Sequence, residues 1–167
     1  MDFFYVDSQY IQYLQTIDSK IPNLSYRTRN KFVCGVVFDI NGKQYFSPLS
    51  SFNKAQRTNF LILDNDGTPI SSLRLSFMMP LPSSALTRLV IANETDIKYR
   101  RLLNKELSYI QKHEKDIKKK AKKVYKIGTN PNHVLAKNCC DFKKLETEAT
   151  QEGFAKFLAD SLTGSAV

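Results

Sequence analysis

One hairpin-like segment limits the folds open to this chain more than any other part of its sequence. Two runs rich in β-branched and aromatic residues, FVCGVVFDI (32–40) and KQYFSPL (43–49), are separated only by Asn41 and Gly42. Asn-Gly between two such runs is the strongest short-range signal for a two-residue β-hairpin. The sequence therefore predicts two antiparallel strands here, with Pro48 at a sheet edge or at the end of the second strand.

The pattern around this hairpin changes from strand-like to helix-like along the chain. Further strands are expected at 3–6, 60–64 and 72–81, and a helix capped by Ser8 is expected before Pro22. A long helical segment is expected to begin at Asn93 or Thr95, with a kink or an end near 114. A helix-breaking segment follows at 128–132, and one or two helices are expected over 141–162. Strands followed by helices predict an α+β fold with an antiparallel sheet. A chain of 167 residues fits one domain, expected to cover 1–167.

The net charge of +9 is concentrated in two zones. From Lys98 to Lys126 there are twelve Lys and Arg against three acids, and from Lys20 to Arg57 there are seven against one, Asp39. Two basic zones on a mildly acidic remainder attract polyanions, and nucleic acid is the first candidate partner. Aromatic residues interleave the second zone, and rings beside cations suit unpaired bases.

The basic helical zone also has a plainer interpretation, as the solvated face of a helix. An acidic membrane surface is a competing partner, but the zone lacks the amphipathic Trp/Phe stripe that membrane binding favours. No apolar run approaches the ~18 residues of a membrane helix. The acidic N-terminus does not resemble a signal peptide, so we expect a cytoplasmic protein whose three cysteines are free thiols.

The residues available for catalysis exclude several reaction types. The chain has two histidines, His113 and His133, and neither lies near the basic aromatic segment, which argues against a two-histidine ribonuclease and a Ser-His-Asp triad. That segment offers a single carboxylate, too few for a Mg²⁺ site. Adjacent Cys139 and Cys140 are poorly spaced for zinc. We therefore expect no metal and no cofactor.

What remains around the hairpin is a set of lysine, arginine, serine and tyrosine side chains. These groups suit RNA cleavage in which the ribose 2′-hydroxyl attacks the adjacent phosphorus, because the substrate then supplies its own nucleophile. Lysines near other cations lose proton affinity and can act as acid or base. PLSSFNK (48–54) also fits an ordinary turn in which Ser50 and Ser51 bind backbone groups.

Several segments resemble the ToxN/AbiQ family, the endoribonuclease toxins of type III toxin–antitoxin systems. The segments, in chain order, are 3–23, 31–51, 75–82, 97–113 and 138–146. The resemblance implies a twisted antiparallel β-core related to the Kid/MazF toxin barrel, surrounded by helices. It implies metal-independent RNA cleavage leaving 2′,3′-cyclic phosphate and 5′-hydroxyl ends. The implied partner is a small repeated antitoxin RNA, folded as a pseudoknot, in a closed heteromeric complex that keeps the toxin from cellular RNA.

The resemblance also places the active groove at the hairpin. Ser51 matches the family serine, Ser50 stands where Thr is more usual, and Asn53 stands at a position that is usually lysine. Ser51 is expected to contact the scissile phosphate or relay the 2′ proton. The remaining assignments are Lys31 and Lys54 for phosphorane charge and acid–base work, Tyr26 for orientation, Arg27, Arg29, Asn53 and Arg57 for the RNA backbone, and Phe52 for stacking.

The basic helical zone is expected to hold the antitoxin RNA backbone, since phosphate contacts position RNA without reading its sequence. The residues assigned to this contact are Lys98, Arg100, Arg101, Lys105, Lys118, Lys119 and Lys122. Three alternatives stay open on sequence alone: a non-catalytic RNA-binding module, a Kid/MazF-like ribonuclease with a protein antitoxin, and a DNA-binding regulator.

Overall fold

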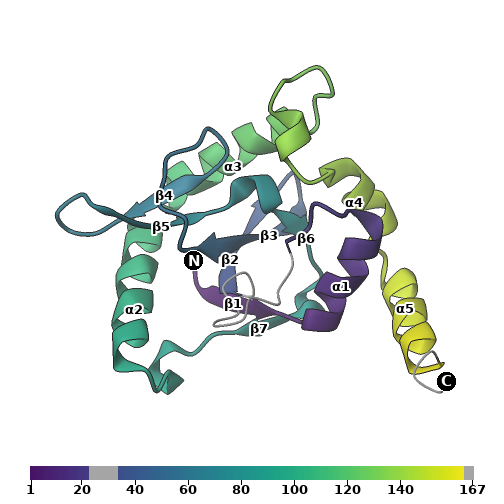
Figure 1. Cartoon of the computed structure of the whole chain (residues 1–167), viewed down its shortest axis with the longest axis horizontal. Helices are drawn as coiled ribbons and strands as arrows, with labels where there is room; N and C mark the ends of the chain where they lie inside the picture. Colours follow the sequence, from purple (N-terminus) through teal and green to yellow (C-terminus); the bar gives the residue numbers. More distant parts are fainter. Residues whose placement is uncertain (23–33, 164–167) are drawn as a thin grey trace.

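An antiparallel sheet fills the middle of the molecule, with helices around it (Figure 1). The computed structural model describes residues 1–22 and 34–163. The strands are β1 (Phe3–Val6), β2 (Cys34–Ile40), β3 (Lys43–Ser50), β4 (Phe60–Leu63), β5 (Pro69–Leu73), β6 (Met79–Pro80) and β7 (Leu86–Arg88). The described strands follow the order β4-β5-β3-β2-β1-β7, and β6 pairs with β3 on the same edge as β5. The expected α+β fold is confirmed.

The sheet is open rather than closed. Among the described residues its order ends at β4 on one side and at β7 on the other, and these two strands do not pair. The barrel-like closure that the family resemblance implies is therefore not confirmed.

The hairpin between β2 and β3 forms as predicted. Asn41 and Gly42 both have positive φ, 55° and 79°, which is the backbone of a type I′ turn whose twist matches the flanking strands. Pairing runs from Ile40 opposite Lys43 to Gly35 opposite Pro48. Pro48 is neither at the end of the strand nor on an edge strand, because β3 continues to Ser50 and lies between β2 on one side and β5 and β6 on the other.

Gly35 allows β2 and β3 to approach closely at this point. A Cβ atom at this position would lie 2.1 Å from the backbone oxygen of Ser47 and 2.6 Å from the ring of Phe46. Only glycine fits such a contact without moving a strand. The backbones at the start of β2 and near the end of β3 therefore lie in close contact. The predicted active groove lies at this end of the hairpin.

The segment expected as one strand over 72–81 is broken. β5 ends at Leu73, a 3-10 helix η1 (Leu75–Phe77) follows, and β6 contributes two residues. The backbone of Ser76 explains the break, since its N–H donates to Thr58 O and its oxygen accepts from Cys140 N. These contacts come from distant parts of the chain, so the local strand pattern could not reveal them.

Five α-helices occur in the described residues. They are α1 (Ser8–Ile17), α2 (Ile97–Lys112), α3 (Glu114–Gly128), α4 (Phe142–Glu148) and α5 (Gln151–Thr163), with shorter 3-10 helices η2 (Ser83–Ala85), η3 (Ile91–Asn93) and η4 (Ala136–Asn138). α1 begins at Ser8, but its cap is Asp7, whose carboxylate accepts from Gln9 N at 2.8 Å. The break expected near 114 is confirmed at His113, between α2 and α3.

Buried hydrophobic residues join the sheet and helices into one core. Phe46 on β3, Leu14 on α1, Ile110 on α2 and Phe142 on α4 are all fully buried. Polar contacts add to this packing: the hydroxyls of Tyr45 and Tyr125 both donate to Oε1 of Glu146, at 2.7 and 2.8 Å. This shared carboxylate ties α4 to both the sheet and α3.

The C-terminal helix α5 packs on α1. The ring of Phe154 lies 4.9 Å from that of Tyr10 and 5.6 Å from that of Tyr13, and the Tyr13 hydroxyl donates to Glu148 O at 2.9 Å. None of the α5 residues is fully buried. The last helix therefore covers α1 rather than the sheet.

Candidate functional site

The segment 51–59, which leaves β3 and leads to β4, is held in place by buried polar side chains. Ser72 on β5 donates its hydroxyl hydrogen to Phe52 O at 2.6 Å. Asn59, which is 1% exposed, donates from Nδ2 to Lys54 O at 2.9 Å. Because both anchors are buried, the backbone that follows Ser50 is fixed by the sheet.

The two adjacent serines are placed differently. Ser50 is buried, and its hydroxyl accepts a hydrogen bond from Phe52 N at 3.2 Å. Ser51 is exposed at the end of the strand. Ser50 therefore shapes the turn, while Ser51 is the serine that a bound molecule can reach.

Ser51 borders a small hollow, which we call the serine hollow. Its volume is about 90 Å³, and its lining residues are Leu49, Ser50, Ser51, Ile70, Tyr99, Leu102 and Glu106. Glu106 is only 3% exposed, and burial raises its pKa to about 7. The Ser71 hydroxyl opposes that rise without reaching hydrogen-bonding geometry. A carboxyl that titrates near neutral pH thus lies in the same hollow as Ser51.

Glu106 was not assigned to the site from the sequence. It lies three residues after Leu103 and four before Ile110, both fully buried, so it occupies the apolar face of α2. That spacing was a signal that could have found it.

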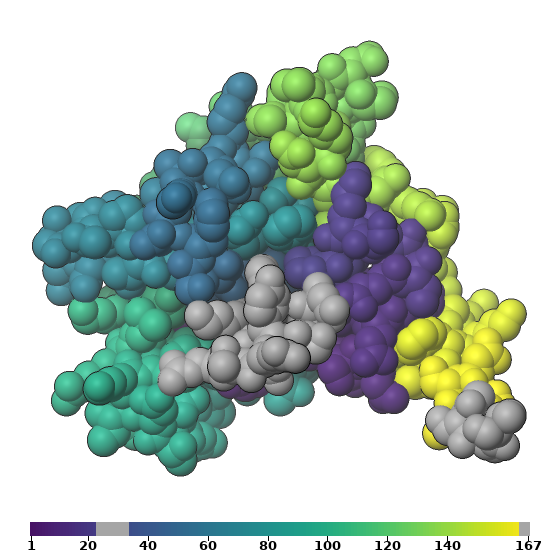
Figure 2. All heavy atoms as spheres, in the orientation of Figure 1, coloured from purple at the N-terminus to yellow at the C-terminus, as the bar shows by residue number. Residues whose placement is uncertain are grey.

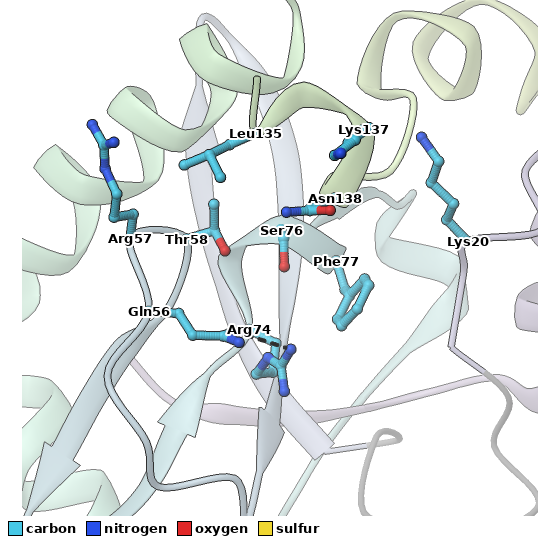
Figure 3. Close-up of a pocket in the computed structure, with 10 residues that line it drawn as sticks. All are labelled: Lys20, Gln56, Arg57, Thr58, Arg74, Ser76, Phe77, Leu135, Lys137 and Asn138. Atoms are coloured by element: carbon cyan, nitrogen blue, oxygen red, sulfur yellow. Dashed lines mark hydrogen bonds between the residues drawn. The ribbon is translucent and has the colours of Figure 1, made fainter. Parts of the chain in front are cut away.

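A larger hollow is lined in part by the second half of segment 51–59, residues 56–58, and we call it the basic hollow. Its volume is about 660 Å³ (Figure 3). The lining residues are Lys20, Gln56, Arg57, Thr58, Arg74, Ser76, Phe77, Leu135, Lys137 and Asn138. Figure 2 shows this face of the molecule, on which segment 51–59, η1 and the η4 region meet. Of the described residues, four cations and no carboxylate line the hollow, so it favours an anion.

The predicted site residues are distributed unevenly around these hollows. Tyr26, Arg27, Arg29 and Lys31 lie outside the described residues. Of the others, Arg57 lines the basic hollow and Lys54 is exposed. The ring of Phe52 lies beneath the Arg74 guanidinium, with 4.6 Å from Cζ to the ring centre. Asn53 donates a hydrogen bond from Nδ2 to Pro69 O at 3.2 Å.

The basic helical zone divides between α2 and α3, which meet at His113. Lys105 pairs with Asp64 at 2.7 Å, and Lys118 pairs with Glu114. Arg100 donates from Nη1 to Glu94 O at 3.5 Å. The remaining assigned cations of this zone, Lys98, Arg101, Lys119 and Lys122, are exposed.

Other features bear on what the site can hold. Within residues 1–22 and 34–163, no group of three or more His, Cys, Asp or Glu side chains is placed to bind a metal ion. Cys34, Cys139 and Cys140 are buried free thiols, and burial raises the pKa of each. Over the same described ranges, no helix has the length and apolar character needed to cross a membrane.

The family model described as toxin ToxN of type III toxin–antitoxin systems matches residues 2–150. This chain belongs to the ToxN family. Endoribonuclease ToxN of Bacillus thuringiensis subsp. kurstaki is 34% identical to it, over 90% of this chain and 82% of the relative. Endoribonuclease ToxN of Pectobacterium atrosepticum is 30% identical, over 92% and 99%. Endoribonuclease AbiQ of Lactococcus lactis subsp. lactis is 30% identical, over 89% and 87%.

Solved structures of ToxN-family proteins share the fold. One of them comes from work on selective toxin inhibition by a non-coding RNA pseudoknot in type III systems. Its TM-score is 0.78 at 31% sequence identity, and the match covers 89% of this chain and 95% of that chain. AbiQ, an anti-phage endoribonuclease of a type III system, has a TM-score of 0.73 at 27% identity, over 89% and 94%. The helix α5 begins just after the residues that match the family model.

Proposed function

We propose that this ToxN-family chain is a metal-independent endoribonuclease toxin of the cytoplasm. The 2′-oxygen of one ribose attacks the adjacent phosphorus, the bond from phosphorus to the 5′-oxygen breaks, and the products carry a 2′,3′-cyclic phosphate and a 5′-hydroxyl. One proton must leave the 2′-hydroxyl and one must reach the departing 5′-oxygen. The observation that carries the proposal is the exposed Ser51 on a rigid strand end, at the position of the family serine and beside a strongly basic hollow.

The proposed roles follow from where the groups lie. Ser51 contacts the scissile phosphate, and Lys54, three residues further along the fixed segment, stabilises the charge that builds on the phosphorane. Ser50 keeps the turn in shape through its contact with Phe52 N. Lys31 and Tyr26 complete the proposed set as a charge-stabilising acid or base and as an orienting group.

The proposed reaction is tested by incubating the purified chain with total cellular RNA in excess EDTA. We expect cleavage that survives EDTA, with 5′-hydroxyl ends that a kinase can label directly and cyclic phosphates that resist a ligase needing a 3′-hydroxyl. Cleavage that returns only when Mg²⁺ is added back, or 5′-phosphate ends, would contradict the proposal. RNA binding without any cleavage would favour a non-catalytic module.

We also propose that a small repeated RNA, folded as a pseudoknot, occupies the active groove and assembles with the toxin into a closed complex. The relatives support this, because one solved neighbour comes from work on inhibition by an RNA pseudoknot and another is an anti-phage enzyme. The proposed role is therefore growth arrest during phage infection. Tandem short repeats in the DNA upstream of the gene are expected, whereas a neighbouring gene for an acidic protein antitoxin would contradict this part.

The exposed lysines of α3 give a prediction about RNA affinity. Replacing Lys119 and Lys122 by glutamine should weaken binding of mixed-sequence RNA and lower the slope of log affinity against log salt by about one to two, since each phosphate contact contributes about 0.7 on a single strand. A 2′-O-methyl RNA allows binding to be measured without cleavage. The matched control replaces Lys144 and Lys156, exposed lysines of α4 and α5. Equal slopes for the two double variants would refute the assignment.

A further inference from the structure

The basic hollow contains an arginine whose environment calls for an anion. The Arg74 guanidinium stacks against two rings, with its Cζ 4.6 Å from the centre of Phe52 and 5.0 Å from that of Phe77. Its Nε is buried and has no hydrogen-bond partner. Within the part of the chain that the structure describes, its one polar contact is a long one, from Nη2 to Gln56 Oε1 at 3.5 Å (Figure 3).

No carboxylate in residues 1–22 and 34–163 compensates this charge. None of the described ion pairs includes Arg74, and none of the residues lining the basic hollow is acidic. Burial lowers the pKa of Arg74, although an arginine stays charged at neutral pH. A half-buried cation without a described counterion is costly, and a phosphate in the hollow that accepts from the terminal Nη atoms of Arg74 would lower that cost, while the buried Nε would keep no partner.

The other walls of the hollow suit the rest of a nucleotide. Phe77 is half-buried, so part of its ring is open for a base to stack on. Lys137 and Asn138 lie across the hollow from Arg74 (Figure 3) and supply a second cation and an amide. The volume of about 660 Å³ lies within the usual range for ligand pockets.

The hollow also lies close to the proposed cleavage site. Arg74 N donates to Pro48 O at 2.9 Å, which places it beside the end of β3, and Phe52 directly follows Ser51. A nucleotide here would therefore belong to the same RNA strand as a phosphate at Ser51.

We propose that the basic hollow is an RNA subsite, in which Arg74 binds a backbone phosphate and Phe77 stacks an unpaired base, adjacent to the bond cleaved at Ser51. This inference rests on the proposed ribonuclease function, which the EDTA assay tests separately. A chain that fails to cleave RNA would overturn the function, whereas the binding measurements below decide the subsite.

The test measures binding of a mixed-sequence, single-stranded 2′-O-methyl RNA to the full chain over a range of salt. Arg74→Gln should raise Kd by about 10- to 100-fold, because a charge-assisted contact is lost, and should lower the salt slope by about 0.7. Phe77→Leu should raise Kd by about fivefold or more with the slope unchanged, because stacking releases no counterions. The two variants thus separate the phosphate contact from the base contact.

Two further variants guard against misfolding. Lys137→Gln alters an exposed side chain of η4 and should raise Kd by up to about fivefold. Arg88→Gln removes an exposed arginine on β7 that pairs with Asp2 at 3.0 Å, and it is the control for loss of one positive charge outside the hollow. If Arg74→Gln, Phe77→Leu and Lys137→Gln all bind the RNA as Arg88→Gln does, the subsite proposal is overturned.

Discussion

Replacing Ser51 by alanine should reduce RNA cleavage by about 10²- to 10³-fold while leaving the fold unchanged. Loss of one well-placed donor to the charge of a transition state typically has an effect of this size. Ser51 is exposed at the end of β3, so its removal leaves no cavity and the free energy of unfolding should change by no more than about 1 kcal/mol. The measurement is the initial rate of formation of 5′-hydroxyl ends, together with a thermal melt.

The matched control for this variant is Ser83→Ala. Ser83 in η2 is also an exposed serine, and its hydroxyl donates to Gln44 Oε1 at 3.2 Å, away from the lining residues of both hollows. Its rate should equal that of the wild type. A Ser51→Ala protein that cleaves within about tenfold of the control would remove Ser51 from the catalytic set and leave Lys54 and the residues before β2 to carry the reaction.

Replacing Glu106 by glutamine should remove a large part of the pH dependence of stability. The carboxyl is buried under the sheet, which raises its pKa from 4.5 to about 7. Below about pH 4.5 it is protonated in both the folded and the unfolded chain. Between pH 4.5 and 7 the unfolded chain loses this proton while the folded chain keeps it, so stability falls as the pH rises.

Above pH 7 the carboxylate is charged in both the folded and the unfolded chain, so the folded chain bears the full free-energy cost of burying the charge. A pKa difference of this size corresponds to about 3 kcal/mol. Glutamine has nearly the same shape and does not titrate. Relative to the wild type, Glu106→Gln should therefore gain up to about 3 kcal/mol of unfolding free energy between pH 5 and pH 8.

The measurement is urea unfolding of both proteins at several pH values, and the quantity of interest is their difference. The titratable groups that face Glu106 are Tyr99 on its own helix and Cys34 at the start of β2, and both are present in the variant. Glu152→Gln removes an exposed carboxyl on α5 and provides the control. A difference between Glu106→Gln and wild type that stays constant with pH would show that Glu106 does not titrate near neutrality.

Local signals predicted the elements that depend on neighbours in the sequence. The Asn41-Gly42 turn formed because Asn and Gly readily adopt the positive φ that a type I′ turn needs at both central residues, and the twist of this turn matches the strands. The break at His113 and the end of α3 at Gly128 also followed from the local pattern. The strand expected over 72–81 failed because Ser76 hydrogen-bonds to Thr58 and Cys140, which are near it only in the folded chain.

Some residues of the candidate site could likewise be recognised from the sequence, and others could not. Ser51 and the basic character of the hairpin region were recognisable from residue types and from the family resemblance. Arg74 and Glu106 were not, although Arg74 stands between Leu73 and Leu75 and Glu106 falls on the apolar face of α2. Their importance depends on what surrounds them, two aromatic rings for Arg74 and a buried face beneath Ser51 for Glu106.

By itself the sequence determined the antiparallel hairpin, the α+β order of elements, the excess of positive charge and the position of the serine proposed to be catalytic, because these depend on backbone preference, on residue type or on short motifs. Only the tertiary structure decided that the described sheet stays open, that Ser50 is buried while Ser51 is exposed, and that Arg74 faces a basic hollow with no counterion among the described residues. The physical reason is burial: desolvation and hydrogen-bond partners are supplied by residues far away in the chain.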